Sequence, residues 1–88
     1  ALRADTRGMS ESGSSVEIEY CVPCGFLDRA ETIQHQLLSQ FGERLDRVGL
    51  VTGDHGVLRV SVDGAVVFDK SEDEYDVDEI TRRVRAEL

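Results

Sequence analysis

The chain has 88 residues, of which 18 are acidic and 10 are basic, and its formal net charge at pH 7 is −8. A chain of this length forms one small domain, and its negative field disfavours binding to nucleic acid or to anionic membranes. No apolar run is long enough to cross a bilayer and no basic-then-apolar leader opens the sequence, so we expect a soluble, cytoplasmic protein.

Nine of the ten basic residues are arginine, which leaves Lys70 as the single lysine. The acidic side chains are spread along the whole chain, as on a solvated surface. This composition indicates either a halophilic host, whose salt screens the repulsion between like charges, or an ordinary acidic protein. Both interpretations stay open.

The first half of the chain predicts an arm, a strand and a helix. Residues 1–15 lack hydrophobic periodicity and are rich in serine, glycine and charge, which predicts a disordered arm. Residues 16–20 alternate apolar and acidic side chains, which predicts a strand with one buried face. Apolar residues then recur every three or four positions, which predicts an amphipathic helix over about 25–41. Its apolar stripe contains Phe26, Ala30, Ile33, Leu37 and Phe41, widened by Leu27 and Leu38. Gly42 fits the left-handed residue that ends many helices.

The second half begins with three more predicted strands. Residues 45–52 form the first of them, and a turn-rich break follows at 53–56. Residues 57–62 alternate cleanly between apolar and polar side chains. Asp63-Gly64 is a strong signal for a two-residue hairpin turn with positive φ, which leads into the last strand at 65–68.

An acidic loop leads to the final helix. Asp76 and Glu79 have the spacing of a helix-capping pair, and the helical stripe continues to Leu88. The predicted order is β-α-β-β-β-α, with a parallel crossover first and an antiparallel hairpin later. The sequence therefore predicts an α/β (α+β) fold. It is a single thioredoxin-like domain over 16–88, in which two helices cover a small four-stranded mixed sheet.

Both cysteines, Cys21 and Cys24, lie where the strand pattern gives way to the helix pattern. A C-x-x-C pair at such a junction is typical of a dithiol redox motif. Only a thiolate attacks a disulfide, and an ordinary thiol is roughly 3 % ionised at pH 7. The unpaired N–H groups and the dipole at a helix start favour the thiolate. Since Cys21 ends the strand just before the helix, we expect it to be exposed and to attack, with Cys24 resolving the mixed disulfide.

Two neighbours of the cysteines fit supporting roles. Pro23 fixes one φ angle and donates no N–H, which suits the first turn of a helix. Gly25 leaves the backbone next to the sulfur atoms uncrowded.

Three other interpretations of Cys21 and Cys24 remain. They could be small buried residues, or a static disulfide, which a reducing compartment disfavours. They could also be half of a zinc site, but His35 and His55 are twenty residues apart and lack the H-x3–5-H spacing of a zinc finger. A metal would then need a second chain. We favour the redox role and assign no metal and no cofactor.

The two histidines differ in their predicted surroundings. His35 lies on the helix among polar neighbours and is expected to be solvated. His55 lies in the loop before the third strand, which in thioredoxin-like folds approaches the C-x-x-C and usually presents a cis-proline; this chain has no proline there. A plain turn residue is the favoured interpretation of His55, and a residue that borders and tunes the dithiol is the alternative.

Several stretches resemble the selenoprotein W-like (Rdx; SelT/SelW/SelH) family. They are V-x-I-x-Y-C-x-x-C-G over 16–25, Arg29-Ala30, G-x-L-x-V-x-V-x-G over 56–64 and Phe68-x-Lys70, and the resemblance covers about residues 16–88. It implies a thioredoxin-like fold with the C-x-x-C in the loop between the first strand and the first helix. It also implies a thiol-dependent, often glutathione-linked, redox role.

The resemblance places Cys24 where members of this family carry selenocysteine, and a cysteine there is typical of prokaryotic members. Selenium normally occupies the most reactive position, so the resemblance favours Cys24 as the attacking sulfur. The helix-field argument favours Cys21, and both assignments stay open.

The sequence thus predicts a thiol–disulfide redox protein that cycles Cys21 and Cys24 between dithiol and disulfide. A thiol/disulfide protein or glutathione would be its redox partner. The alternative is a non-enzymatic interaction module that senses redox state or binds a metal.

Overall fold

The computed structural model of this protein describes residues 13–88. Its elements are β2 (Ser14–Tyr20), α1 (Leu27–Phe41), the short 3-10 helix η2 (Gly42–Arg44), β3 (Leu45–Thr52), β4 (Leu58–Val62), β5 (Ala65–Asp69) and α2 (Val77–Glu87). The predicted order of strands and helices is confirmed, and each long element lies within two residues of its expected bounds. Most of the predicted N-terminal arm lies outside the described residues, and Ser14 and Ser15, which were expected in the arm, begin β2.

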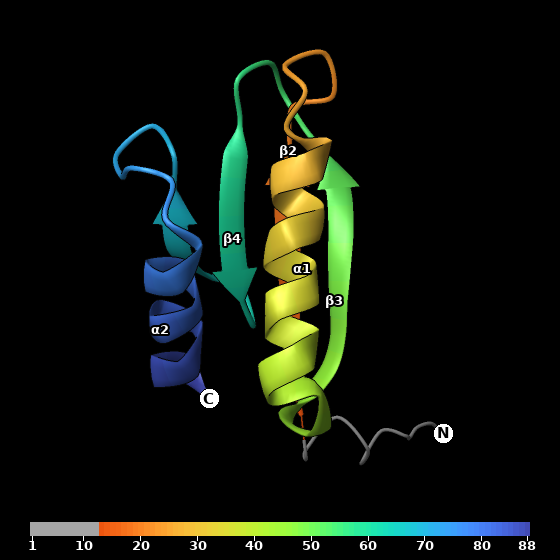
Figure 1. Cartoon of the computed structure of the whole chain (residues 1–88), viewed down its shortest axis with the longest axis vertical. Coiled ribbons are helices and arrows are strands. Elements are labelled where there is room, and N and C mark those ends of the chain that lie inside the picture. Colours follow the sequence, from red (N-terminus) through yellow and green to blue (C-terminus); the bar gives the residue numbers. More distant parts are fainter. Residues whose placement is uncertain (1–12) are drawn as a thin grey trace.

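The four strands form one mixed sheet in the order β3-β2-β4-β5. β2 is parallel to β3 and antiparallel to β4, and β4 is antiparallel to β5. Figure 1 shows both helices on the same side of this sheet, with α1 in front of β2 and α2 beside it. The predicted α+β fold, a four-stranded mixed sheet with two helices, is confirmed, and the two helices form a single layer.

The period-two pattern of the strands decides which face of the sheet is covered. Val16 and Ile18 of β2 are fully buried beneath the helices, and Leu58, Val60 and Val62 of β4 continue that face. The residues between them point to the opposite face, which faces solvent. There Arg59 pairs with Glu19 and Asp69, which lie directly opposite it on the two neighbouring strands, at N–O distances of 2.9 and 3.4 Å.

The helix α1 is amphipathic, but its apolar stripe is narrower than predicted. Its buried residues are Ala30, Ile33, Leu37 and Phe41. Leu27 and Leu38 are 41 % and 45 % exposed, so their expected place in the stripe was wrong. With 3.6 residues per turn, both lie roughly a quarter turn from the centre of the buried side chains.

The sequence predicted an N-terminal cap for α2 and a left-handed C-terminal residue for α1, and only the cap is present. Asp76 caps α2 as predicted, because its Oδ1 accepts hydrogen bonds from the N–H groups of Asp78 and Glu79. Gly42 does not end α1 in the left-handed region: its φ of −54° is right-handed, and the chain continues into η2. The Asp63-Gly64 turn does adopt the predicted positive φ values, 51° and 89°.

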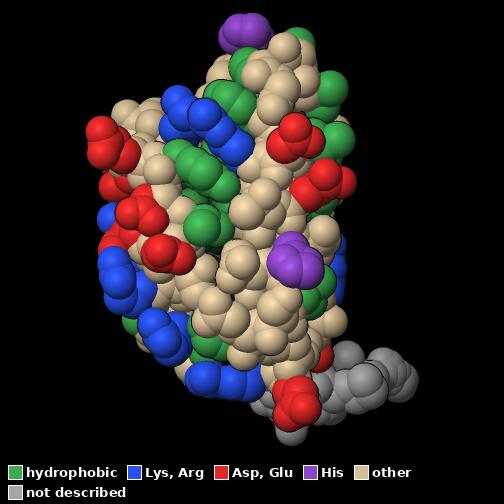
Figure 2. Space-filling view, in the orientation of Figure 1, with side chains coloured by type: hydrophobic (Ala, Val, Ile, Leu, Met, Phe, Trp, Pro, Cys, Tyr) green, Lys and Arg blue, Asp and Glu red, His purple; other side chains and the backbone are tan. Residues whose placement is uncertain are grey.

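Figure 2 shows acidic and basic side chains interspersed over the helical side of the molecule, with no large patch of a single sign. No helix in the part of the chain that the structure describes has the length and apolar character needed to cross a membrane.

Candidate functional site

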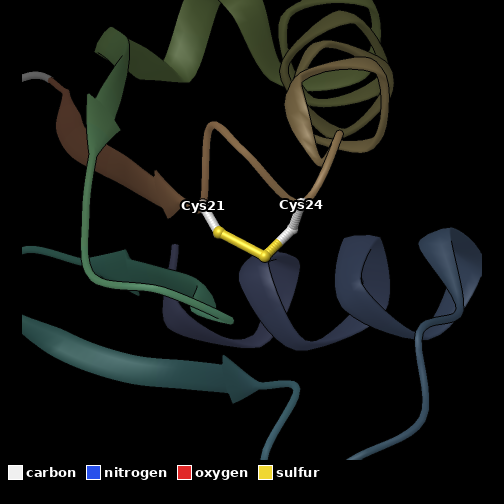
Figure 3. Close-up of a disulfide and its surroundings, with 2 residues drawn as sticks. All are labelled: Cys21 and Cys24. Atoms are coloured by element: carbon white, nitrogen blue, oxygen red, sulfur yellow. A yellow bond between two sulfur atoms is a disulfide. The ribbon is translucent and has the colours of Figure 1, made fainter.

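The cysteines lie in a tight loop between the end of β2 and the start of α1 (Figure 3). Cys21 and Cys24 are joined by a disulfide, with their Cα atoms 5.4 Å apart. Their positions at the strand end and ahead of the helix follow the sequence prediction. Their exposure does not, because Cys21 is fully buried and Cys24 is the partly exposed member of the pair. The expectation that Cys21 is accessible was wrong.

Backbone hydrogen bonds explain the burial of Cys21. Its N–H donates to the carbonyl oxygen of Val57 at 2.8 Å, which extends the pairing of β2 beyond the strand and holds the cysteine under the segment before β4. Its own carbonyl oxygen accepts from the N–H of Phe26 at 3.4 Å. Both of its main-chain groups are thus satisfied, as is usual for a buried residue.

The loop between the cysteines turns at Gly25. The N–H of Gly25 donates to the carbonyl oxygen of Val22 at 3.1 Å, and its φ is +76°. Apart from its two chain neighbours, a Cβ at this position would meet no atom within 4 Å. Glycine is therefore favoured here by the left-handed backbone conformation.

The start of α1 lies closer to Cys24 than to Cys21 along the chain. Phe26 occupies the N-cap position and no side chain caps the helix there. Pro23 is exposed in the turn ahead of the helix, so its predicted place in the first helical turn was wrong. The field of a helix N-terminus falls off within about one turn, and Cys24 is the cysteine nearer to this helix in sequence.

A second loop brings His55 to the cysteines. The N–H of Gly53 donates to the carbonyl oxygen of Tyr20 at 2.9 Å, which ties the loop to the end of β2, and the N–H of Val57 donates to that of Asp54 at 3.1 Å, which closes the turn. A ring nitrogen of exposed His55 and the Sγ atoms of Cys21 and Cys24 all lie within 4.8 Å of one another. His55 is an exposed turn residue, as the favoured interpretation has it, and it also borders the two cysteines; His35 is exposed on α1 as expected.

Two cations and two aromatic rings form a cluster beside the cysteine loop. The Arg29 guanidinium lies 5.2 Å from the centroid of the Phe26 ring and 5.0 Å from that of Tyr75, and the Lys70 ammonium lies 5.5 Å from the Phe26 ring. Burial raises the pKa of the Tyr75 phenol, and the charge of Arg29 partly opposes this. These distances allow cation–π contacts that hold both positive charges next to the residue that starts α1.

This cluster was not identified as a functional feature from the sequence. Arg29 and Lys70 appear there only as parts of motifs, although the single lysine of an acidic chain is a signal that could have singled out Lys70. Tyr75 gave no such signal, because it approaches α1 only through the loop between β5 and α2.

The sequence matches the model of the Rdx family over residues 15–86. This chain belongs to the Rdx family. The match includes both cysteines and every strand and helix except the first residue of β2 and the last residue of α2. The predicted resemblance is confirmed. No match was found among curated proteins.

Two solved structures are similar to this chain in fold. A Bordetella parapertussis protein shares 35 % identity with this chain, with a TM-score of 0.81, and the match covers 86 % of this chain and 99 % of that one. A selenoprotein W-related protein from Vibrio cholerae shares 22 % identity, with a TM-score of 0.77, over 84 % of this chain and 95 % of its own. The second likeness shows the common fold.

Proposed function

We propose that this Rdx protein is a thiol–disulfide redox protein that cycles Cys21 and Cys24 between dithiol and disulfide. The observation that carries the proposal is the disulfide across the β2–α1 loop, whose two sulfur atoms differ in access. A sulfur that a partner can reach and a second sulfur protected behind it are the two components that a dithiol–disulfide exchange needs.

In the reducing direction, Cys24 is the attacking sulfur. It is the exposed member and stands ahead of the uncapped start of α1, whose field favours a thiolate. The Cys24 thiolate attacks one sulfur of a partner disulfide and releases the other as a thiolate. The Cys21 sulfur then attacks Cys24 in the mixed disulfide, which releases the second partner thiol and leaves the Cys21–Cys24 disulfide. Two electrons pass to the partner, and its two sulfur atoms take up two protons.

The assignment of Cys24 agrees with the place of selenium implied by the family resemblance. It reverses the sequence argument for Cys21, which required that residue to be exposed. The burial of Cys21 suits a resolving sulfur, which has to reach only its own neighbour.

Glutathione or a disulfide-containing protein is the partner that this site suits. Glutathione carries two carboxylates, and Arg29 and Lys70 are the cations held beside the loop. In an otherwise acidic chain they offer the local positive charge that an anionic thiol needs. Pro23, Gly25 and His55 support the pair by shaping the loop and bordering the sulfur atoms.

A redox titration tests the proposal. The protein is equilibrated in glutathione and dithiothreitol buffers, its thiols are trapped, and the products are weighed as intact protein. We expect a reversible two-electron midpoint of roughly −200 to −300 mV, near the cytosolic poise. Failure of the pair to form a reversible disulfide would rule out the redox function.

A further inference from the structure

Three side chains that commonly bind metals converge from two loops. The Sγ atoms of Cys21 and Cys24 and a ring nitrogen of His55 lie within 4.8 Å of one another, and within residues 13–88 no other His, Cys, Asp or Glu joins them. The sequence argument against a zinc site rested on the spacing of two histidines. The structure needs only one of them, because the loop before β4 carries His55 to the cysteine pair.

We propose that the reduced form of this protein binds one Zn²⁺ ion through Cys21, Cys24 and His55. Zinc is bound by thiolate sulfur at about 2.3 Å and by imidazole nitrogen at about 2.0–2.1 Å, so the ligand atoms of a tetrahedral site lie roughly 3.5–3.8 Å apart. The two sulfur atoms move apart to this distance once their bond is reduced. The His55 ring then has to close by roughly 1 Å from the 4.8 Å limit.

The two loops are already tied together near the proposed site. The hydrogen bond from the Cys21 N–H to the Val57 carbonyl oxygen joins the cysteine loop to the loop of His55, only two residues from the histidine. The bond from the Gly53 N–H to the Tyr20 carbonyl oxygen joins them a second time. The backbone around Cys21 and His55 is therefore held together before a metal arrives, which lowers the ordering cost of binding.

Electrostatics favours a cation at this position. In the reduced protein Cys21 is fully buried, and its sulfur can carry a negative charge there only beside a cation. A divalent ion is such a cation and compensates the charges of both thiolates. The net charge of −8 also raises the local concentration of cations around the molecule.

The proposed site has three protein ligands and an open fourth position. His55 is exposed and Cys24 is partly exposed, so the ion can be reached from solvent. Three protein ligands and one solvent molecule form the arrangement of reactive zinc sites, whereas structural zinc sites are closed by four protein ligands.

Metal binding and disulfide formation exclude each other. Binding of Zn²⁺ to the dithiol releases two protons from the cysteine thiols. Oxidised glutathione can then take two electrons from the bound thiolates, which gives the Cys21–Cys24 disulfide, two molecules of glutathione and free Zn²⁺ after uptake of two protons. Zinc therefore competes with the redox cycle proposed above, although binding to the reduced protein does not depend on that cycle.

The test uses fully reduced protein and measures binding of Zn²⁺ against a chromophoric chelator. We expect one ion per chain. We expect His55→Ala to weaken binding at least about tenfold, because even the loss of a residue that only supports a metal ligand weakens binding by about that factor. His35→Ala is the matched control, since it removes the other histidine of the chain from an exposed helix position. It should leave the affinity unchanged.

Cobalt binding gives a second readout that reports the ligands directly. With Co²⁺ in place of zinc, the wild-type protein should show thiolate-to-cobalt charge transfer and the intense visible bands of four coordination. His55→Cys should restore tight binding with a stronger charge-transfer band. Oxidation to the disulfide should abolish both signals.

Several results would overturn the proposal. The reduced protein could bind no Zn²⁺, wild type and His55→Ala could bind it with equal affinity, or two chains could share one ion; each of these outcomes contradicts the proposal. None of them affects the redox titration, which is carried out without metal, so failure here is distinguishable from failure of the redox function.

Discussion

The backbone N–H of Cys21 donates a 2.8 Å hydrogen bond to the carbonyl oxygen of Val57. This bond buries the first cysteine and brings the loop of His55 beside it. The two cysteines of the β2–α1 loop differ in exposure, and His55 lies beside both of them. The difference in exposure gives rise to the first prediction, on the reactivity of the two sulfur atoms.

We expect Cys24 to react faster than Cys21 in the reduced protein. Cys24 is partly exposed and lies at the start of α1, whereas Cys21 is fully buried. Alkylation by iodoacetamide at pH 7, followed by intact mass, should be at least about tenfold faster for Cys21→Ala, which retains Cys24, than for Cys24→Ala. Circular dichroism of both variants controls for unfolding, and equal rates would contradict the assignment of Cys24 as the attacking sulfur.

Gly25→Ala should destabilise the protein by about 1–2 kcal/mol, the cost of holding an L-residue in the left-handed region. Its φ is +76° and a Cβ would meet no atom within 4 Å beyond the two chain neighbours, so we expect backbone strain to dominate. Gly42→Ala is the matched control, because Gly42 is also open but has a φ of −54°. It should be neutral or stabilising by up to about 1 kcal/mol. Urea unfolding measures both, and equal effects would contradict the argument from φ.

Leu37 and Leu38 are neighbours on α1 with opposite surroundings. Leu37 is fully buried in the core and Leu38 is 45 % exposed. Leu37→Ala should lower the free energy of unfolding by about 2–5 kcal/mol, and Leu38→Ala should change it by less than about 0.5 kcal/mol. Denaturant unfolding of the two variants compares them directly. A large loss for Leu38→Ala would place it in the core, as the sequence pattern suggested.

Acid should remove the stabilisation that Asp69 provides. Hydrogen bonds from the Ser71 N–H and hydroxyl lower the pKa of Asp69, and Arg59 adds to this effect. Because the folded-state pKa is lowered, the stabilisation is complete above the unfolded pKa of about 4 and is lost as the pH falls through the lower folded value. Asp69→Asn should therefore be less stable than wild type at pH 7, and the difference should shrink below about pH 4. A difference that does not depend on pH would show that the carboxylate charge is not involved.

Salt should stabilise the folded protein if its surface is adapted to a salt-rich host. The net charge of −8 creates self-repulsion, which ions screen. We expect the urea midpoint to rise steadily from low to molar sodium chloride, with marked loss of folding at the low end. A midpoint that is insensitive to salt would favour the ordinary acidic protein.

The fold was largely predictable because its signals are local. Alternation in β2 and β4, the Asp63-Gly64 turn and the Asp76 cap each depend on residues close together in the sequence, and all are present in the structure. The width of the buried stripe of α1 was overestimated because it does not depend on local signals alone. Apolar character at Leu27 and Leu38 can be read from the sequence, but the edge of the core depends on where the sheet and α2 lie.

The candidate site was only half predictable. Cys21 and Cys24 stand out through their spacing, whereas their exposure depends on the hydrogen bond to Val57, a residue 36 positions away from Cys21. The approach of His55 depends on the same long-range pairing. Local pattern can name such residues, but only the assembled sheet brings them together.

The one-sided covering of the sheet has a practical consequence for electrochemistry. Glu17 is exposed on the central strand β2, and by alternation it points to the face without helices, away from the buried Val16 and Ile18. The cysteine loop lies beyond the end of this strand rather than on its face. Attachment of the molecule to an electrode through the uncovered face would therefore leave the core intact and the sulfur atoms within reach of dissolved thiols, so the potential of the pair could be read directly as a current.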